Sequence, residues 1–327
     1  MFILFGVFLL TFLIIISIAI IRVKSLFSAV MLSGIFSLLM AANFFILDAA
    51  DVALTEAAIG AGITTVLFLA ALALTRETEQ RETHSRVPLL VLAIAAAPII
   101  FATFDKPRLG DPNAPVHQHV APWYLEKTPE LIGIPNVVTA VLGSFRGYDT
   151  LGEVFVIFTA GIGVLFVFGV HQRKAAISGG ELAQQARGIR HHLIPRIIGK
   201  IFIPVILLFA LYVQFHGEYG PGGGFQAGAI FAAGLILYSL LEGVDKALQK
   251  FPPKVLPWFV ASGALLYALV GFVCLALGGN FLDYSVLHSN PVVGQHIGLI
   301  LIEIGVGVTV FGVMLSIFLA FAARESK

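Results

Sequence analysis

The stretch QHIGLILIEIGVGVTVFGVMLSIFLAFA, residues 295–322, decides the class of fold. It is predominantly apolar, and its only ionisable side chains are those of His296 and Glu303. A helix needs about 20 mostly apolar residues to cross the roughly 30 Å of hydrocarbon in a bilayer. The stretch is therefore long enough to span a membrane with some tilt.

Eight further stretches of the chain have the same character. Their hydrophobicity is continuous and lacks the period of two that a lipid-facing β-strand shows, so helices are predicted rather than a barrel. We therefore predict an all-α, polytopic membrane protein with nine transmembrane helices. The predicted spans are residues 2–21, 26–47, 52–75, 87–104, 151–170, 197–215, 224–241, 256–277 and 295–322.

Composition argues against several other classes of protein. The 327 residues are only 12% charged, whereas about 25% is usual for a soluble domain. The net charge of +1 leaves no basic surplus for binding nucleic acid. Cys274 is the only cysteine, which excludes an internal disulfide and a cysteine-built metal site. Motifs of zinc proteases and serine hydrolases are missing, so we expect no enzyme activity, no cofactor and no fixed metal ion.

The distribution of lysine and arginine predicts the topology. Of the 20 basic residues, 16 fall in loops or ends on the side of the C-terminus. The remaining four, on the side of the N-terminus, are Lys106, Arg108, Lys127 and Arg146. Short cytoplasmic loops accumulate lysine and arginine. We therefore predict that the N-terminus lies outside and the C-terminus lies in the cytoplasm.

Two extramembrane segments divide the chain into modules. Residues 105–150 contain six prolines, too many for a continuous helix, and residues 136–145 have the pattern of a short helix in the membrane interface. Residues 171–195 contain a Gly-Gly pair and a basic cluster, as expected of a cytoplasmic linker. The predicted organisation is a three-helix module at 1–84, a two-helix module with an outside proline-rich loop at 85–172, a linker at 173–195 and a four-helix module at 196–327.

Glu303 lies close to the middle of the last predicted span. It is about eight residues, or roughly 12 Å, into that helix, where a buried charge costs several kcal/mol unless a partner or water compensates it. His296 lies seven residues earlier on the same face. Two interpretations remain open: Glu303 binds or relays a proton or a cation, or a protonated Glu303 cross-links helices.

Glu56 lies about one turn inside the third predicted span. Asp51 precedes it and is a natural N-cap for that span. Capping does not account for Glu56, which would otherwise face lipid, so a functional role is favoured for Glu56. Gly60 and Gly62 follow and make the helix flexible. This flexibility predicts either a π-bulge or unwound turn that opens a hydrated path, or close packing of helices.

Glu153 begins the fifth predicted span. Asp149 or Thr150 is predicted to cap that helix, and a carboxylate in the first turn favours the positive helix end. Glu153 is therefore a candidate ion-binding residue that helix electrostatics alone also explains. Arg146 and Asp149 are predicted to be structural.

The glycine-rich sequence HGEYGPGGGFQAG, residues 216–228, joins the sixth and seventh spans on the predicted outer side. Its glycines permit tight turns, but the Gly-Lys-Ser/Thr of a phosphate-binding loop is missing. His216 and Glu218 either gate and collect cations or belong to a solvated turn. Phe225 is predicted to pack.

Charged residues at the cytoplasmic ends of the sixth and seventh spans need less explanation. Contact with anionic lipid is sufficient to explain Arg196 and Lys200. Glu242 and Asp245 are predicted to be ordinary surface charges.

Several of these segments together resemble parts of Mrp-type multisubunit cation/proton antiporters. The segments 48–63 and 146–153, the first with its DVALTE, are similar to the C-terminal membrane region of the large A subunit. The chain from about Arg190 onward, with PGGGF at 221–225, resembles the four-helix B subunit. Membrane-bound hydrogenase complexes carry similar modules as three small subunits. The first module also resembles the J subunit of respiratory complex I, whose third helix carries a π-bulge.

The resemblance implies a membrane subunit that takes part in exchanging protons for Na⁺ or another monovalent cation. It implies acidic stations at Glu56 and Glu153 and, less directly, at Glu303. The further candidates for the ion path are His296, His216 and Glu218. The candidates for structural or hinge roles are Asp51, Gly60, Gly62, Pro221, Gly222 and Phe225.

The chain departs from a whole A subunit, because no lysine lies in the middle of any predicted span. We therefore expect it to work with other Mrp-like subunits, surrounded by lipid, in the inner membrane of a prokaryotic cell. Two alternatives remain open: the same module in a hydrogenase-type or other redox-driven pump, and a scaffold subunit that conducts nothing.

Overall fold

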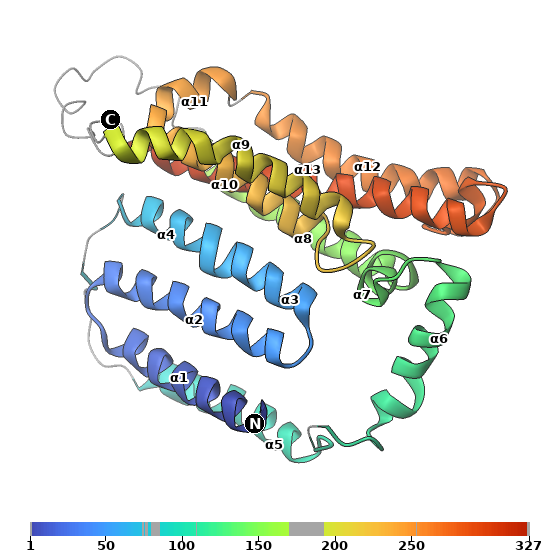
Figure 1. The fold of residues 1–327 in the computed structure, drawn as a ribbon. Coiled ribbons are helices and arrows are strands. Elements are labelled where there is room, and N and C mark those ends of the chain that lie inside the picture. The colour runs from blue at the N-terminus through green and yellow to red at the C-terminus, as the bar shows by residue number, and fades with distance from the viewer. Residues whose placement is uncertain are drawn as a thin grey trace.

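The computed structural model describes residues 2–73, 75, 78–79, 86–108, 110–169, 193–252 and 254–325. Among these residues nine helices are long and apolar enough to cross a membrane, and no β-strand is formed (Figure 1). The predicted all-α, polytopic fold is therefore confirmed. The orientation of the two termini in the membrane stays a prediction, and so does the division into modules.

The helices follow the predicted spans closely. In chain order they are α1 (Phe2–Arg22), α2 (Leu26–Ile46), the continuous series α3 (Ala50–Thr55), π-helix η1 (Glu56–Thr64) and α4 (Thr65–Leu72), then α5 (Val87–Phe104), α8 (Gly147–Gly169), α9 (Leu193–His216), α10 (Gly224–Glu242), α12 (Leu256–Ala276) and α13 (Pro291–Glu325). The connections contain η2 (Val116–Val120), α6 (Ala121–Leu131), α7 (Val137–Ala140), η3 (Val141–Phe145), α11 (Val244–Lys250) and the 3₁₀ turn η7 (Tyr284–Leu287).

The C-terminal helices pack around α13. This helix contacts α8, α10 and α12 along its length, and residues such as Leu299, Val310 and Leu315 are fully buried there. Glycines allow α10 and α13 to approach closely, because a Cβ on Gly228 would lie 2.5 Å from the Gly307 carbonyl oxygen. Without a hydrophobic driving force between helices in lipid, such close backbone packing is a main source of stability.

The N-terminal helices form a separate layer. Helix α2 contacts α1 on one side and η1 and α4 on the other (Figure 1, blue). This layer meets the C-terminal helices through η1 against α10 and α4 against α13. Helix α5 has no buried residue, so its apolar surface is available to lipid or to another protein.

The proline-rich segment between α5 and α8 contains four short helical elements, η2, α6, α7 and η3. Helix α6 tolerates Pro122 in its first turn, where a helix has no hydrogen-bond partner for the amide. The short helix predicted at 136–145 is present as α7 followed by η3, and the Asn136 side chain caps it. The predicted linker at 173–195 lies almost entirely outside the described residues.

Two predicted helix caps are wrong. The third span begins at Ala50, so Asp51 is in its first turn and does not cap it. The fifth span begins at Gly147, four residues earlier than predicted, because the chain enters it directly from η3. Asp149 and Thr150 therefore lie inside the helix, where Asp149 pairs with Arg146 at 2.5 Å and Thr150 donates to the Leu142 carbonyl.

Candidate functional site

Two cavities meet at Glu303 in the middle of α13. The larger has a volume of about 570 Å³, and the smaller has a volume of about 170 Å³. Polar side chains of the larger cavity are those of Asp51, Thr55, Thr139, Thr150, Glu153, Gln226 and Glu303. The smaller cavity is lined by Gln214, Phe215, Glu218, Tyr219, Ile300 and Glu303. Glu303 is the residue that the two linings share.

Close backbone packing positions Glu303. A Cβ on Gly224 would collide with the Glu303 carbonyl oxygen, so only glycine lets α10 begin at this point. The Glu303 carboxylate lies against Gly217 and Gly223, where added Cβ atoms would be 3.1 and 3.4 Å from Oε1. Gly223 has φ +114°, a conformation that side chains disfavour. The backbone of the glycine-rich loop therefore lies directly against one side of the carboxylate.

The larger cavity joins parts of the chain that are distant in sequence. Asp51 and Thr55 come from α3, Glu153 comes from α8, and Gln226 comes from α10. The Gln226 amide donates to the Thr55 hydroxyl at 2.7 Å and so ties α10 to α3. The structure thus brings Glu153 and Glu303, two of the three predicted acidic stations, to one cavity together with Asp51.

Asn136 is a central residue that the sequence analysis missed. Its Nδ2 donates to Asp51 Oδ1 at 3.1 Å and to the carbonyl oxygens of Gly217 and Gly220 at 3.0 Å each. Its Oδ1 accepts from the amides of Val138 and Thr139 and caps α7. An asparagine directly before an apolar helical run is an N-cap signal, which could have marked the residue but not its distant partners.

Glu218 and His296 form a pair beside the smaller cavity. His296 Nδ1 lies 3.0 Å from Glu218 Oε2, and Glu218 is only 7% exposed. His296 is on α13, two turns from Glu303, so the prediction that both residues use one helix face agrees with their position around Glu218. Glu218 therefore belongs to a buried cluster and not to a solvated turn.

Glu56 lies outside both cavities. It begins η1, and its carboxylate folds over Gly60 beside Ser37 of α2, each within 3 Å of where a Cβ on Gly60 would be. Gly60 and Gly62 lie within this π-helix, and the position of Gly60 against Ser37 also agrees with the alternative of close helix packing. Within this chain Glu56 faces α2 rather than Glu153 and Glu303.

The other predicted residues in and next to the glycine-rich loop differ in their burial and contacts. His216 stacks on Tyr212 with ring centroids 4.9 Å apart, and Pro221 is exposed. Gly222 is buried, and a Cβ there would lie 2.6 Å from the Val213 carbonyl oxygen. Phe225 packs against the core, as predicted, and also lines the larger cavity.

Two buried tyrosines donate hydrogen bonds to backbone segments beside the larger cavity. The Tyr284 hydroxyl donates to the Gly143 carbonyl at 3.0 Å, and the Tyr267 hydroxyl donates to the Gly147 carbonyl at 2.8 Å. Burial raises the pKa of Tyr284 far above its ordinary value, so this hydroxyl stays a donor. These bonds hold η3 and the start of α8 in place.

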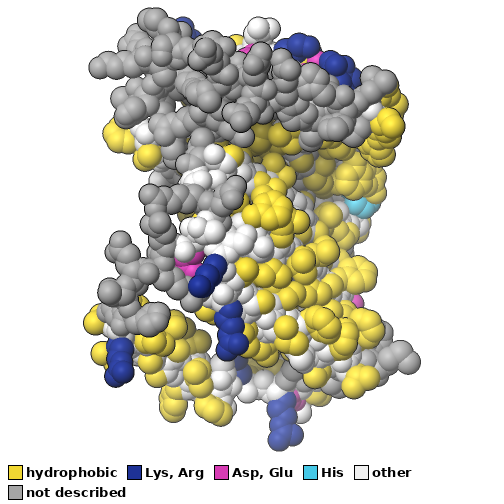
Figure 2. All heavy atoms as spheres, turned by 90° about the vertical axis from the view of Figure 1, so that its left-hand side faces the viewer, with side chains coloured by type: hydrophobic (Ala, Val, Ile, Leu, Met, Phe, Trp, Pro, Cys, Tyr) yellow, Lys and Arg dark blue, Asp and Glu magenta, His cyan; other side chains and the backbone are white. Residues whose placement is uncertain are grey.

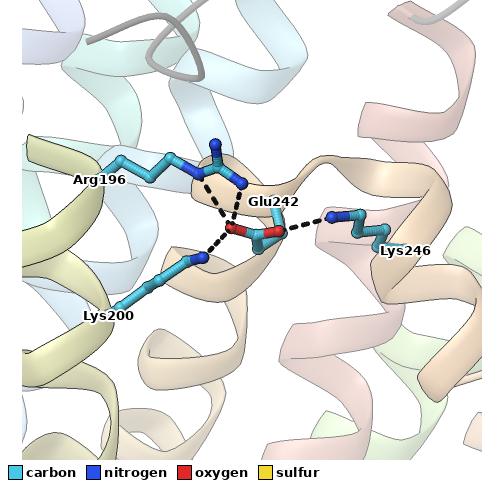
Figure 3. Close-up of polar contacts among 4 residues, drawn as sticks. All are labelled: Arg196, Lys200, Glu242 and Lys246. Carbon is cyan, nitrogen blue, oxygen red and sulfur yellow. Dashed lines mark hydrogen bonds and ion pairs between the residues drawn. The ribbon is translucent and has the colours of Figure 1, made fainter. Parts of the chain in front are cut away.

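Glu242 is a buried ion-pair centre, and the prediction of a surface charge is wrong. Its carboxylate accepts from Arg196 at 3.0 Å and from Lys200 and Lys246 at 2.7 Å each (Figure 3). Arg196 and Lys200 therefore have a protein partner, and lipid contact is not needed to explain them. Figure 2 shows this end of the molecule, where lysine and arginine side chains border apolar surface.

Three family comparisons cover most of the chain. Residues 194–316 match the family described as "Domain related to MnhB subunit of Na+/H+ antiporter". Residues 11–77 match the family of the D subunit of MBH, and residues 89–185 match the family of its E subunit.

Individual proteins are similar as well. The "Putative antiporter subunit mnhB2" of Staphylococcus haemolyticus (strain JCSC1435) is 35% identical over 134 residues, which are 40% of this chain and 94% of that protein. A probable K(+)/H(+) antiporter A/B subunit of Rhizobium meliloti (strain 1021) is 28% identical over 234 residues, which are 65% of this chain but only 23% of that protein.

A solved structure shares the fold. A chain in the "Structure of Mrp complex from Dietzia sp. DQ12-45-1b" superimposes with a TM-score of 0.74 at 24% identity. The match covers 96% of this chain and 34% of the other. Nearly all the helices of this chain are therefore arranged as they are in one part of that longer chain.

Proposed function

This chain belongs to the family of Mrp-type multisubunit cation/proton antiporter subunits, and on that premise we propose that its buried carboxylates form part of an ion path. The path contains Glu153, Glu303 and Glu218, and it exchanges protons for Na⁺ or another monovalent cation. The chain acts together with other Mrp-like subunits in the inner membrane of a prokaryotic cell.

The observation that carries this proposal is the position of Glu303 between two cavities. On one side it shares a cavity of about 570 Å³ with Glu153 and Asp51, and on the other side it shares a cavity of about 170 Å³ with Glu218. An ion that passes between the cavities meets Glu303. A carboxylate in a low-dielectric site is not stable empty and charged, so it takes up either a proton or a cation.

Glu56 serves as a separate station in this proposal. It lies in the π-helix η1, next to α2 and away from both cavities. π-Helical turns widen the backbone ladder and are frequent at functional sites. We assign Glu56 to a separate branch of the path, between η1 and α2.

The test is Glu303→Gln in the assembled complex, reconstituted into proteoliposomes. Loss of the titratable group should lower Na⁺/H⁺ exchange by about tenfold or more, since the amide cannot exchange a proton for a cation. The matched control is Glu130→Gln, because Glu130 is exposed on α6 and pairs only with Lys127 among the described residues. Full exchange by the Glu303→Gln complex, with all subunits present, would contradict the proposal.

A second candidate function is translocation in a redox-driven complex. It is favoured by the matches of residues 11–77 and 89–185 to the D and E subunits of MBH. Mild-detergent purification separates the two: antiporter subunits alone support exchange, whereas hydrogenase-like catalytic subunits support redox-driven pumping. A scaffold role predicts that Glu303→Gln leaves transport unchanged while bulky residues at Gly60, Gly222 or Gly305 disrupt the complex.

A further inference from the structure

The smaller cavity is lined by six residues, and two of them are acidic. It is enclosed by the end of α9, the loop that follows it and the middle of α13. Two carboxylates, those of Glu218 and Glu303, line a volume of only about 170 Å³. That volume holds a small hydrated ion but no sizeable organic molecule.

One oxygen of Glu218 is left without a partner. Oε2 lies 3.0 Å from His296 Nδ1, but Oε1 is buried and has no hydrogen-bond partner among the described residues. The Glu218 side chain is 9% exposed. An unsatisfied buried oxygen of a carboxylate is costly, and a cation or a proton bound to this carboxylate lowers that cost.

The loop holds Glu218 rigidly in this orientation. The Asn136 amide N–H donates to the Glu218 carbonyl oxygen at 3.0 Å. The Asn136 side chain and the Thr139 hydroxyl both donate to the Gly217 carbonyl oxygen. The Glu218 backbone is thus fixed on one side and its Oε2 is fixed by His296, so the carboxylate is held rigidly beside the cavity that it lines.

The acidic side chains around the smaller cavity indicate which class of ion it binds. Glu218 and Glu303 are both acidic side chains, and Asp51 lies with Glu303 on the larger cavity. In the described part of the chain no three His, Cys, Asp or Glu side chains group around one point as metal ligands. A divalent ion needs a larger oxygen shell from the protein or retained water, whereas a monovalent cation needs less compensating charge.

We propose that the smaller cavity binds one partly hydrated monovalent alkali cation between the Glu218 and Glu303 carboxylates that line it. Gln214, which also lines the cavity, and water supply further ligands. The site deepens the proposed function, on which its role in transport rests. Binding itself does not depend on that role and can be measured separately.

Equilibrium binding of ²²Na⁺ to the purified complex tests the site. We expect saturable binding that K⁺ or Li⁺ displaces and choline does not. Glu218→Gln should remove one binding equivalent per complex or weaken it by about tenfold or more, whereas Glu130→Gln should bind like the wild type. Glu218→Asp, which keeps the charge but shortens the reach, provides a second variant if the amide prevents assembly.

A measurement on the wild-type complex makes the assignment independent of variants. Saturating Na⁺ should slow the modification of Glu218 by dicyclohexylcarbodiimide, read by peptide mass spectrometry, relative to choline. Modification that Na⁺ does not slow, or binding that Glu218→Gln leaves intact, overturns the site without touching the proposed function. If Na⁺ binding depends on Glu218 but the reconstituted complex shows no Na⁺/H⁺ exchange, the site is supported and the proposed function is contradicted.

Discussion

The buried share is 72% in the α13 span, 61% in the α10 span and 39% in the α12 span, whereas it is 11% in the α8 span, the α9 span and each of the first three spans, and zero in α5. The C-terminal helices therefore carry their own core, built on close glycine contacts between α10 and α13. The N-terminal helices expose most of their apolar surface. This difference indicates that α10 and α13 are largely buried within the chain, whereas lipid or other subunits cover the N-terminal helices and the outer faces of α8 and α9.

The candidate site lies where these two regions meet. Asp51 and Thr55 come from the N-terminal layer, and Gln226 and Glu303 come from the C-terminal bundle. Polar bonds join the regions there, because Gln226 donates to Thr55 and Asn136 donates to Asp51. Apolar contacts of η1 with α10 and of α4 with α13 also hold this boundary, and the larger cavity remains where the packing between the regions is incomplete.

The largest effect is expected for Gly228→Val in α10. The new side chain meets the Gly307 carbonyl at 2.5 Å and Val310 at 2.9 Å, so α10 and α13 must separate, at a cost of about 3 kcal/mol or more. Melting of the detergent-solubilised chain measures it. Gly6→Val in α1 is the control, because a Cβ there meets nothing within 4 Å. Equal losses from both variants would refute the contrast between the two regions.

A smaller but clear effect is expected for Glu242→Ala. The variant leaves Arg196, Lys200 and Lys246 without their shared carboxylate. These cations are 37 to 55% exposed, so water compensates in part, and we expect about 2 kcal/mol of lost stability. Asp245→Ala, an exposed acid in the same connection, should change the melting temperature little. An equal shift from both would mean that the buried centre contributes nothing.

Asn136→Ala should act at the boundary itself. It removes three donated bonds and the cap of α7, at about 1 to 2 kcal/mol. The characteristic readout is hydrogen exchange of the loop 216–223, which should rise while the α12–α13 contact stays protected. Asn113→Ala in an exposed turn is the matched control. Unchanged exchange in the loop would show that Asn136 does not hold the two regions together.

The membrane-spanning helices can be predicted from the sequence because the lipid bilayer restricts their length and composition. Every helix that crosses hydrocarbon must be long and apolar, so α5 is predicted with both ends correct and α13 is recognised by its length. The π-helix at Glu56–Thr64 is also indicated, because two glycines close together weaken a helix. These features depend on neighbouring residues along the chain.

Contacts between distant segments are not readable in the same way. Glu242 resembles a surface charge because nothing in its own span shows that Arg196 and Lys200 of α9 reach it. Asn136 has an N-cap signal, but its bonds to Asp51 and Gly217 join residues about 80 positions apart. Likewise, the sequence indicates Glu153 and Glu303 separately, and only the packing of α8 against α13 puts them on one cavity.

The smallest effect is expected for Leu92→Ala in α5. Leu92 is 64% exposed, so truncating it leaves no protein cavity, and the stability of the solubilised chain should change by less than about 0.5 kcal/mol. The same change at Leu299, which is fully buried in α13, should cost about 3 kcal/mol. Repeating both measurements in the assembled complex sharpens the contrast. A loss at Leu92 that arises only in the complex would show that another subunit packs on α5, whereas an unchanged small effect would leave lipid as its neighbour.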